Sequence, residues 1–259
     1  MPARPVPCKV LQVDELHVYV YETRGEMGLA AALDVAAAMR RILAERPARM
    51  IFAAAPSQNE LLAELAAMDG LNWGRVEAFH MDEYVGLPEN APQRFGYFLR
   101  LHLFDMVHPG RVEYMNGNAP DPAAECRRYA ALLAERPVDI VCAGIGENGH
   151  MAFNDPHVAD FDDPQTVKVV TLDQVCRLQQ VHDGAFPTLD AVPDRALTVT
   201  MPALMAAQQI FCVVPGPTKA EAVFKTLRGP IGEHCPATAM RRHPQATLYL
   251  DVASAAHIL

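Results

Sequence analysis

The stretch V-D-I-V-C-A-G-I-G-E-N-G-H, residues Val138–His150, decides how the chain is expected to fold. Its first six residues are mostly apolar and lie between Pro137 and Gly144, which is typical of a buried central strand in a parallel sheet. Glycines and polar residues follow directly. In α/β sheets ligands bind at the carboxyl ends of strands, so this loop is the first candidate for a functional site.

Strand-like and helix-like segments alternate on both sides of this stretch. Gly25–Glu45 has apolar residues at helical spacing, and Pro47 follows as a stop signal. Further helices are expected at Pro56–Met68, Gln93–Phe104, Pro122–Glu135 and Lys219–Leu227. Further strands are expected at Val10–Val13, His17–Val20, Met50–Ala55, Val76–Phe79, Val167–Leu172, Ala196–Thr200, Ile210–Val214 and Thr247–Leu250. The alternation predicts an α/β fold, Rossmann-like, with a mainly parallel twisted sheet and helices on both faces.

Length and composition narrow the class of protein. The 259 residues, 51% of them hydrophobic, suffice for one large domain with a substantial core, and no linker interrupts residues 1–259. The formal charge of −9 argues against a nucleic-acid surface, which needs basic residues to replace phosphate counterions. A phosphorylated small molecule is compatible with this charge, because one anion needs only a few local donors.

Cellular context is also suggested by the sequence. The six cysteines include no C-x-x-C pair, so neither a zinc site nor a redox motif is indicated. No secretory signal is visible at the N-terminus, and no apolar run approaches the length of a membrane span. A reducing cytoplasm and no membrane partner are therefore expected.

The loop after Val138–Ala143 can be interpreted in two ways. Its glycines match G-x-G-x-x-G, the dinucleotide fingerprint, at Gly144, Gly146 and Gly149. Asp173 then ends the next strand near the place of a ribose-binding acid. The fingerprint also requires a helix that starts within the motif, and Pro156 and Pro164 oppose one. The dinucleotide interpretation is therefore ranked low.

The second interpretation is an anion and sugar site. Glycines let backbone N–H groups approach a ligand closely. His150 can transfer a proton near neutral pH, Asn148 can donate and accept hydrogen bonds, and Asp155 can hold the imidazole in one tautomer. A tight turn with a satisfied histidine is the alternative. We favour function because glycines, Asn, His and Asp occur together.

The loop after Val76–Phe79 carries the adjacent carboxylates Asp82 and Glu83. Adjacent side chains at a strand end point in different directions, and one of these carboxylates can serve as a base for a carbon-bound proton. His80 beside them could suggest a metal, but no matching ligand cluster exists elsewhere in the sequence. Apolar neighbours weaken a third interpretation, a solvated acidic turn.

Two further loops are candidates for binding a phosphate. Ala53–Asn59 leads into a helix, with Ser57 as a good N-cap and Gln58 beside it, and helix N-termini bind anions. An ordinary capped helix is an equally good interpretation. Lys219 stands in the first turn of another helix, where its charge opposes the helix dipole. A bound anion would explain that position, although solvent exposure is the commoner explanation.

Four segments resemble the glucosamine-6-phosphate deaminase family, also called glucosamine-6-phosphate isomerase. They are D-E-Y-V-G-L at 82–87, G-E-N-G-H-M-A-F-N-D-P at 146–156, A-L-T-V at 196–199 and G-P-T-K-A at 216–220. Their order and spacing follow the family's, and the resemblance extends from the first expected helix to Asp251. The related 6-phosphogluconolactonases share the fold, but D-E-Y-V-G-L is the deaminase form.

The resemblance implies a mechanism without a metal or redox cofactor. His150 would assist opening of the sugar ring, and Asp82 would move a proton between C2 and C1 before ammonia leaves C2. Lys219 and the Ser57 turn would hold the phosphate of the small-molecule sugar phosphate. Further ligand contacts would come from Gln58, Glu83, Gly146 and Gly149.

The sequence departs from the family pattern near the site. Asn148 stands where the family usually has Asp, and Asp155 stands where it has Glu. Arg177 is the candidate for the family's phosphate-binding arginine. His157–Asp163 replaces the segment that binds an activator in some members, so no such activation is expected. The rivals are a divergent isomerase or lactonase and a non-catalytic sugar-phosphate sensor; a homo-oligomer is compatible with the family.

Overall fold

The computed structural model describes residues 2–259, and its centre is one eight-stranded sheet. The strands are β1 (Lys9–Val13), β2 (Leu16–Tyr21), β3 (Ala48–Phe52), β4 (Val76–His80), β6 (Arg111–Glu113), β7 (Ile140–Ala143), β10 (Gln209–Val214) and β11 (Ala246–Asp251). Their order is β1-β2-β11-β10-β7-β3-β4-β6, and every neighbouring pair is parallel except the β1–β2 hairpin. The prediction of a mainly parallel sheet with a central strand after Pro137 is confirmed.

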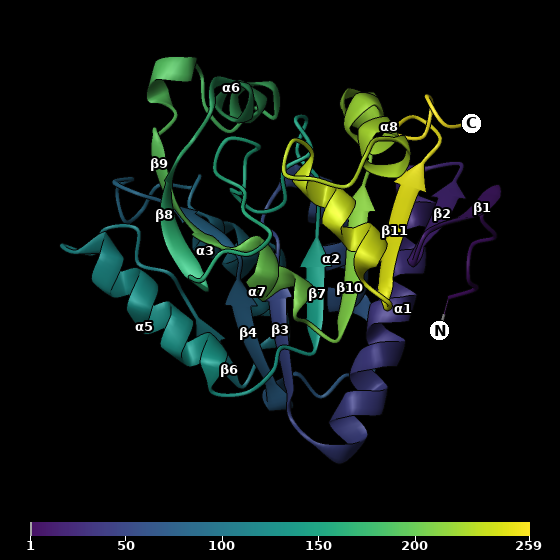
Figure 1. Cartoon of the computed structure of the whole chain (residues 1–259). Coiled ribbons are helices and arrows are strands. Elements are labelled where there is room, and N and C mark those ends of the chain that lie inside the picture. The colour runs from purple at the N-terminus through teal and green to yellow at the C-terminus, as the bar shows by residue number, and fades with distance from the viewer. Residues whose placement is uncertain (1) are drawn as a thin grey trace.

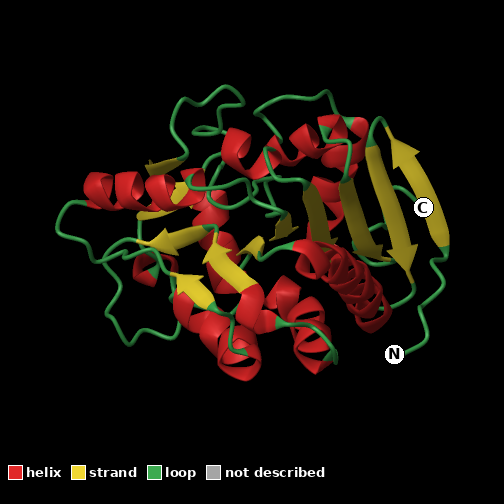
Figure 2. Cartoon of the chain, turned by 90° about the horizontal axis from the view of Figure 1, so that it is seen from below, coloured by secondary structure: helices red, strands yellow, loops and turns green. Residues whose placement is uncertain are grey.

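Helices cover both faces of this sheet, as predicted (Figures 1 and 2). They are α1 (Arg24–Glu45), α2 (Asn59–Ala67), α3 (Phe95–Leu99), α4 (Asp105–Val107), α5 (Pro122–Ala134), α6 (Gln174–His182), α7 (Met201–Met205) and α8 (Ala220–Arg228). A π-helical turn at Arg100–Phe104 joins α3 to α4. The 3-10 turns are η1 (Pro56–Gln58), η2 (Trp73–Arg75), η4 (Leu189–Ala191), η5 (Pro217–Lys219) and η6 (Pro236–Arg242).

The side-chain alternation of β7 explains the two helical layers. Ile140 and Cys142 belong to the core that α1 and α2 cover, whereas Val141 and Ala143 belong to the core beneath α5, α7 and α8. Successive strand residues point to opposite faces, so an apolar strand needs cover on both sides. Among residues 2–259, no helix is long and apolar enough to cross a membrane.

A second sheet was not predicted. It has three antiparallel strands, β5 (Asp82–Tyr84), β9 (Arg195–Val199) and β8 (Val167–Thr171), in the order β5-β9-β8. The expected strands at Val167–Leu172 and Ala196–Thr200 therefore exist, but they lie outside the parallel sheet. Strand β5 starts only one residue after β4, so the chain leaves the main sheet at Met81 and pairs elsewhere.

The carboxyl ends of β3, β4, β7 and β10 meet at one edge of the main sheet, at the top of Figure 1. From β7 the chain runs to β10 and β11 on one side, whereas the earlier strands β3, β4 and β6 lie on the other. Such a reversal of strand order is where α/β proteins form their ligand crevices. Helices α6 and α8 stand above this edge (Figure 1).

Candidate active site

A cavity of about 350 Å³ opens at this edge of the sheet. Six of the predicted site residues line it, namely Ser57, Gln58, Asp82, Gly146, His150 and Lys219. They come from the segments that directly follow β3, β4, β7 and β10. The structure therefore brings together the loops that the sequence analysis singled out separately.

The imidazole of His150 is held from behind by two side chains. Its Nδ1 lies 2.7 Å from Oδ1 of Asn148 and 3.0 Å from Oδ1 of Asp155. Both oxygens accept hydrogen bonds, so Nδ1 carries the proton and the Nε2 lone pair is left for other partners. Burial acts to raise the pKa of Asp155, but hydrogen bonds from His150 and Asn148 more than offset it and lower that pKa below its ordinary value. Asn148 and Asp155 do not line the cavity; they orient the histidine that does.

Two glycines make room for this arrangement. A Cβ atom on Gly146 would collide with the imidazole ring of His150. Gly149 adopts a φ of +86°, and a Cβ there would lie 2.5 Å from Sγ of Cys235. No helix starts within the motif, because residues 151–154 form a turn closed by a bridge between Met151 and Asn154. The argument against a dinucleotide fingerprint is confirmed by this conformation.

Asp82 presents a buried carboxyl group to the cavity. Its side chain is 7% exposed, and no residue from 2 to 259 donates a hydrogen bond to its carboxyl oxygens. Burial raises the pKa of Asp82 well above its ordinary value, and the negative charge of the neighbouring Glu83 adds to the shift. A desolvated carboxylate without partners is a stronger proton acceptor than one in water.

Glu83 points away from the cavity and joins β5 to α3. Its carboxylate accepts hydrogen bonds from the backbone N–H groups of Tyr84, Phe95 and Gly96 at 3.0–3.2 Å. Burial raises the pKa of Glu83 to about 7, although these hydrogen bonds oppose the shift. Glu83 does not line the cavity, so the prediction that it contacts substrate is not supported. Its carboxylate instead holds the start of α3, where Phe95 lines the cavity.

Both ring nitrogens of His80 are engaged in hydrogen bonds, so the histidine of the metal alternative has no free donor atom. The Nδ1 of His80 donates to the carbonyl oxygen of Asp82 over 2.8 Å, and Nε2 accepts from the backbone N–H of Met115 over 2.9 Å. Burial lowers the pKa of His80 to about 4, so the ring is neutral near pH 7.

Lys219 is a buried cation without an ion pair. It is 5% exposed, lines the cavity, and forms no hydrogen bond or salt bridge through its ammonium group with any described residue. Burial lowers the pKa of Lys219. A φ of +90° at Gly216 makes the turn that leads to Lys219, and the carboxylate of Asp251 fixes this turn by accepting from the Gly216 N–H at 3.1 Å. The expectation that solvent exposure accounts for this lysine is wrong.

The turn at Ser57 differs in detail from the prediction. Ser57 lies inside η1 rather than at an N-cap, since Ala55 holds the cap position and no side chain caps this turn. The hydroxyl of Ser57 accepts from Nε2 of Gln58 over 3.2 Å. The Oε1 atom of Gln58 is buried without a partner. Ser57 and Gln58 still line the cavity, together with the residues from Ala53 to Pro56 that precede them.

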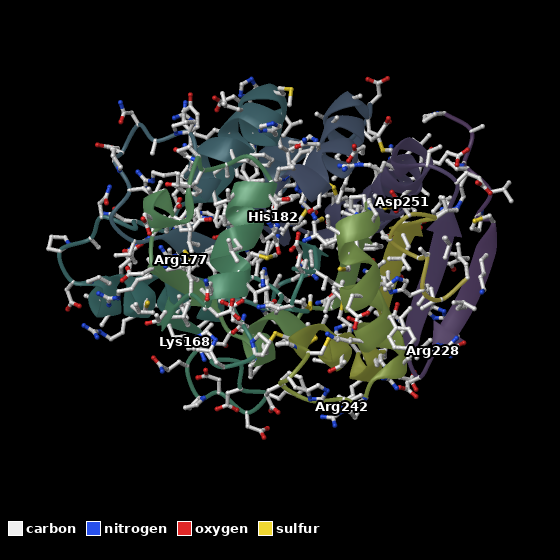
Figure 3. All side chains as sticks on the ribbon, turned by 90° about the horizontal axis from the view of Figure 1, so that it is seen from above. Lys168, Arg177, His182, Arg228, Arg242 and Asp251 are labelled. Atoms are coloured by element: carbon white, nitrogen blue, oxygen red, sulfur yellow. The ribbon has the colours of Figure 1, made fainter. Side chains whose placement is uncertain are left out.

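Arg177 is not at the cavity. Its Nη2 donates to the carbonyl oxygens of Leu189 and Val192 at 2.8 and 2.9 Å. In Figure 3, seen from above, Arg177 lies on the side of α6 that faces away from α8. The prediction that Arg177 binds the phosphate is therefore not supported, because its guanidinium group binds carbonyl oxygens at the two ends of the η4 turn instead.

Sequence reasoning missed the contribution of α6. Gln179, Gln180 and Asp183 line the cavity from this helix and its end. Oε1 of Gln179 accepts from the backbone N–H of Glu147 over 2.8 Å, which ties α6 to the His150 loop. These residues form no motif, so only the helical spacing between Gln179 and Asp183 could have indicated a shared face.

The fold and site define a class of protein: an α/β enzyme with acid–base side chains at the carboxyl edge of a Rossmann-like sheet. Residues 22–249 match the family described as glucosamine-6-phosphate isomerases/6-phosphogluconolactonase. The chain belongs to this family. It is 39% identical over 181 residues to a glucosamine-6-phosphate deaminase of Bacillus cereus, an alignment that covers 70% of this chain and 67% of that protein.

Solved structures give the same result. A monomeric glucosamine-6-phosphate deaminase superposes with a TM-score of 0.86 at 30% identity, covering 93% of this chain and 99% of that one. A 6-phosphogluconolactonase from Thermotoga maritima gives a TM-score of 0.73 at 18% identity, with 91% and 99% covered. The second likeness shows the shared fold alone.

Proposed function

We propose that this enzyme converts glucosamine 6-phosphate, or a close amino-sugar 6-phosphate, into fructose 6-phosphate or the corresponding ketose phosphate and ammonia. One observation carries the proposal. A single cavity is lined by a buried unpaired carboxylate, Asp82, an imidazole with a fixed tautomer, His150, and a buried unpaired cation, Lys219. The similarity to proteins named glucosamine-6-phosphate deaminase supplies the reaction.

The phosphate would bind at Lys219 and the Ser57 turn. A buried ammonium group without a counter-ion is costly unless an anion joins it. The two 3-10 turns η1 and η5 lead into α2 and α8, whose first backbone N–H groups add positive potential at the same edge of the sheet.

The ring would open through His150. Its free Nε2 can accept the proton of the C1 hydroxyl group and deliver a proton to the ring oxygen as the bond between C1 and that oxygen breaks. Asn148 and Asp155 keep Nδ1 protonated during this exchange, so the ring does not turn to its other tautomer.

The isomerisation would use Asp82. Its carboxylate takes the proton from C2 while a proton of the substrate's ammonium group passes to O1, which gives an enolamine. The Asp82 carboxyl group then returns its proton to C1, which gives an iminium group at C2. Water then adds to the iminium carbon, and ammonia leaves as the C2 carbonyl forms. The raised pKa of Asp82 makes this carboxylate a stronger base for a carbon-bound proton than one in water.

We further propose that residues 1–259 act as a single domain in the cytoplasm. A reducing environment suits the six unpaired cysteines, five of which are buried. Every group named in the mechanism comes from one chain, so the proposed chemistry needs no second copy in a homo-oligomer.

The experiment is a direct assay. The protein is incubated with glucosamine 6-phosphate, and ammonia and fructose 6-phosphate are measured beside an Asp82→Asn control. Galactosamine 6-phosphate and 6-phosphogluconolactone are run in parallel, because they test the C4 configuration and the lactonase alternative. If no amino-sugar phosphate releases more ammonia than the control does, the deaminase proposal is wrong. Binding without turnover would favour the sensor.

A further inference from the structure

Asp173 connects helix α6 to the histidine loop through three hydrogen bonds. Its Oδ1 accepts from the backbone N–H of Cys176 over 2.6 Å and caps α6. Its Oδ2 accepts from Nδ2 of Asn148 over 3.1 Å, and its own N–H donates to Oδ2 of Asp155 over 3.3 Å. Asp173 thus contacts both residues that hold His150, although it does not line the cavity itself.

These contacts decide which way the Asn148 amide points. Its Nδ2 donates to the carboxylates of Asp155, at 2.9 Å, and Asp173, at 3.1 Å. Its Oδ1 accepts from the backbone N–H and from Nδ1 of His150. A carboxylate only accepts hydrogen bonds, so a flipped amide would set its oxygen against two carboxylates. The Oδ1 atom is therefore held on the histidine.

We propose that Asp173 is a positioning residue for His150, acting through Asn148 to fix the imidazole with Nδ1 protonated and Nε2 free. This inference rests on the proposed function of His150. It also gives a reason for Asn at 148, because an aspartate there would add a third carboxylate within about 3 Å of Asp155 and Asp173. The other titratable groups facing this cluster are His157 and Cys176.

The first test removes the hydrogen bond between Nδ2 of Asn148 and Oδ2 of Asp173, by changing either residue. In Asp173→Asn the amide oxygen keeps the cap on Cys176, but the NH₂ group then faces the NH₂ group of Asn148. In Asn148→Asp a carboxylate faces the carboxylate of Asp173. Each variant is expected to lose about tenfold in kcat with KM within about twofold of wild type, because the phosphate-binding residues are untouched.

The double variant Asn148→Asp/Asp173→Asn restores the hydrogen bond between residues 148 and 173 with donor and acceptor exchanged, and it restores the net charge of the cluster. The hydrogen bond from residue 148 to Asp155 is not restored, so we expect recovery to be partial, with a loss in kcat no greater than the loss of about tenfold in Asn148→Asp alone, whereas independent effects would multiply to a loss of about 100-fold. The acidic limb of the kcat/KM profile against pH should shift in Asn148→Asp and return toward the wild-type position in the double variant. A multiplicative loss would overturn the proposal.

A matched control separates the helix cap from the contact with Asn148. Serine caps helices well but is too short to reach Asn148, so Asp173→Ser should keep the wild-type Tm and still lose about tenfold in kcat. A wild-type kcat in both Asp173→Ser and Asp173→Asn would show that Asp173 does not position His150. A loss in step with a lower Tm would make it a helix cap only.

Nuclear magnetic resonance of ¹⁵N-histidine protein gives a readout that does not depend on turnover. With the His150 signals assigned through His150→Gln, wild type should show a protonated Nδ1 and an unprotonated Nε2. Asp173→Asn should show a mixture of tautomers, and an unchanged spectrum would contradict the inference. If wild type releases no ammonia but the tautomer depends on Asp173, the proposed function fails while the positioning role stands.

Discussion

The imidazole of His80 donates a 2.8 Å hydrogen bond to the carbonyl oxygen of Asp82, the residue whose carboxyl group faces the cavity. The ring is fully buried, and its other nitrogen accepts from the backbone of Met115. The peptide that carries the proposed carbon base is therefore held by a side chain from the end of β4. The hydrogen bond from the Met115 N–H requires the Nε2 atom of His80 to be unprotonated.

Acid should destabilise the protein partly through His80. Burial lowers its pKa to about 4, from an ordinary value of 6.5, so between these values the unfolded chain binds more protons than the folded one. The contribution is fully present above pH 6.5 and is lost as the pH falls toward 4, by about 3 kcal/mol in the free energy of unfolding.

Urea unfolding at pH 7, 5.5 and 4.5 checks this expectation against His80→Asn, which has no titratable ring. Asp82 and Glu83 contribute with the opposite sign because their pKa values are raised, so the difference between the two proteins is the informative quantity. Parallel pH dependence in the two proteins would show that His80 does not titrate as described.

Replacing Asp82 by asparagine should separate activity from stability. We expect kcat for ammonia release to fall by about 10²- to 10⁴-fold, since an amide cannot take the proton from C2. The free energy of unfolding at pH 8 should stay the same or rise, because a buried carboxylate without a hydrogen-bond partner is removed. Assays and urea curves on the same preparation test both parts, and retained activity would contradict the role of Asp82.

Lys219→Met should weaken substrate binding. A charged hydrogen bond to the phosphate is lost, so KM should rise by roughly 10- to 100-fold while the protein stays folded. Lys225→Met is the matched control, because Lys225 lies on α8, the helix that begins directly after Lys219, but is exposed and pairs with Glu221. Equal KM changes in the two variants would show that only the net charge matters.

Gly146→Ala should displace the ring of His150 without replacing any side chain that transfers a proton. The added methyl group would occupy the space of the imidazole, so the ring must shift, and kcat should fall by about 100-fold. Gly25→Ala in α1 is the control: the nearest atom to its new methyl group is 3.9 Å away, and its activity should match wild type. Wild-type activity in Gly146→Ala would show that the ring position is not critical.

Local sequence patterns were sufficient for most of the fold. The apolar stretch before Gly144 became the central strand β7, and the Ala-rich segment became α1. The antiparallel sheet was missed because its strand β5 has three residues and no alternation of its own. Its pairing with β9 depends on tertiary contacts that link residues 82 and 198.

The site was predictable where residues follow strands and unpredictable where helices fold over it. Asp82, His150 and Lys219 lie in the segments that follow the parallel strands β4, β7 and β10, so their meeting at one edge follows from parallel topology. The prediction that Arg177 binds the phosphate was not supported, because the rotation of α6 about its own axis decides which side chains face the cavity. The importance of Asp173 was hidden for the same reason, since it depends on how the start of α6 lies against Asn148.

Strand β9 forms hydrogen bonds with the strand that carries Asp82 and with the turn that follows His150. Thr198 is paired with Asp82 in the small sheet, and its hydroxyl accepts from the backbone N–H of Phe153, three residues after His150. The next carbonyl, that of Val199, accepts from the amide of Asn154. Strand β9 therefore cross-links the backbone of the carbon base to the turn that follows the ring-opening histidine. A substitution in β9 can disturb both groups at once, although β9 itself supplies neither.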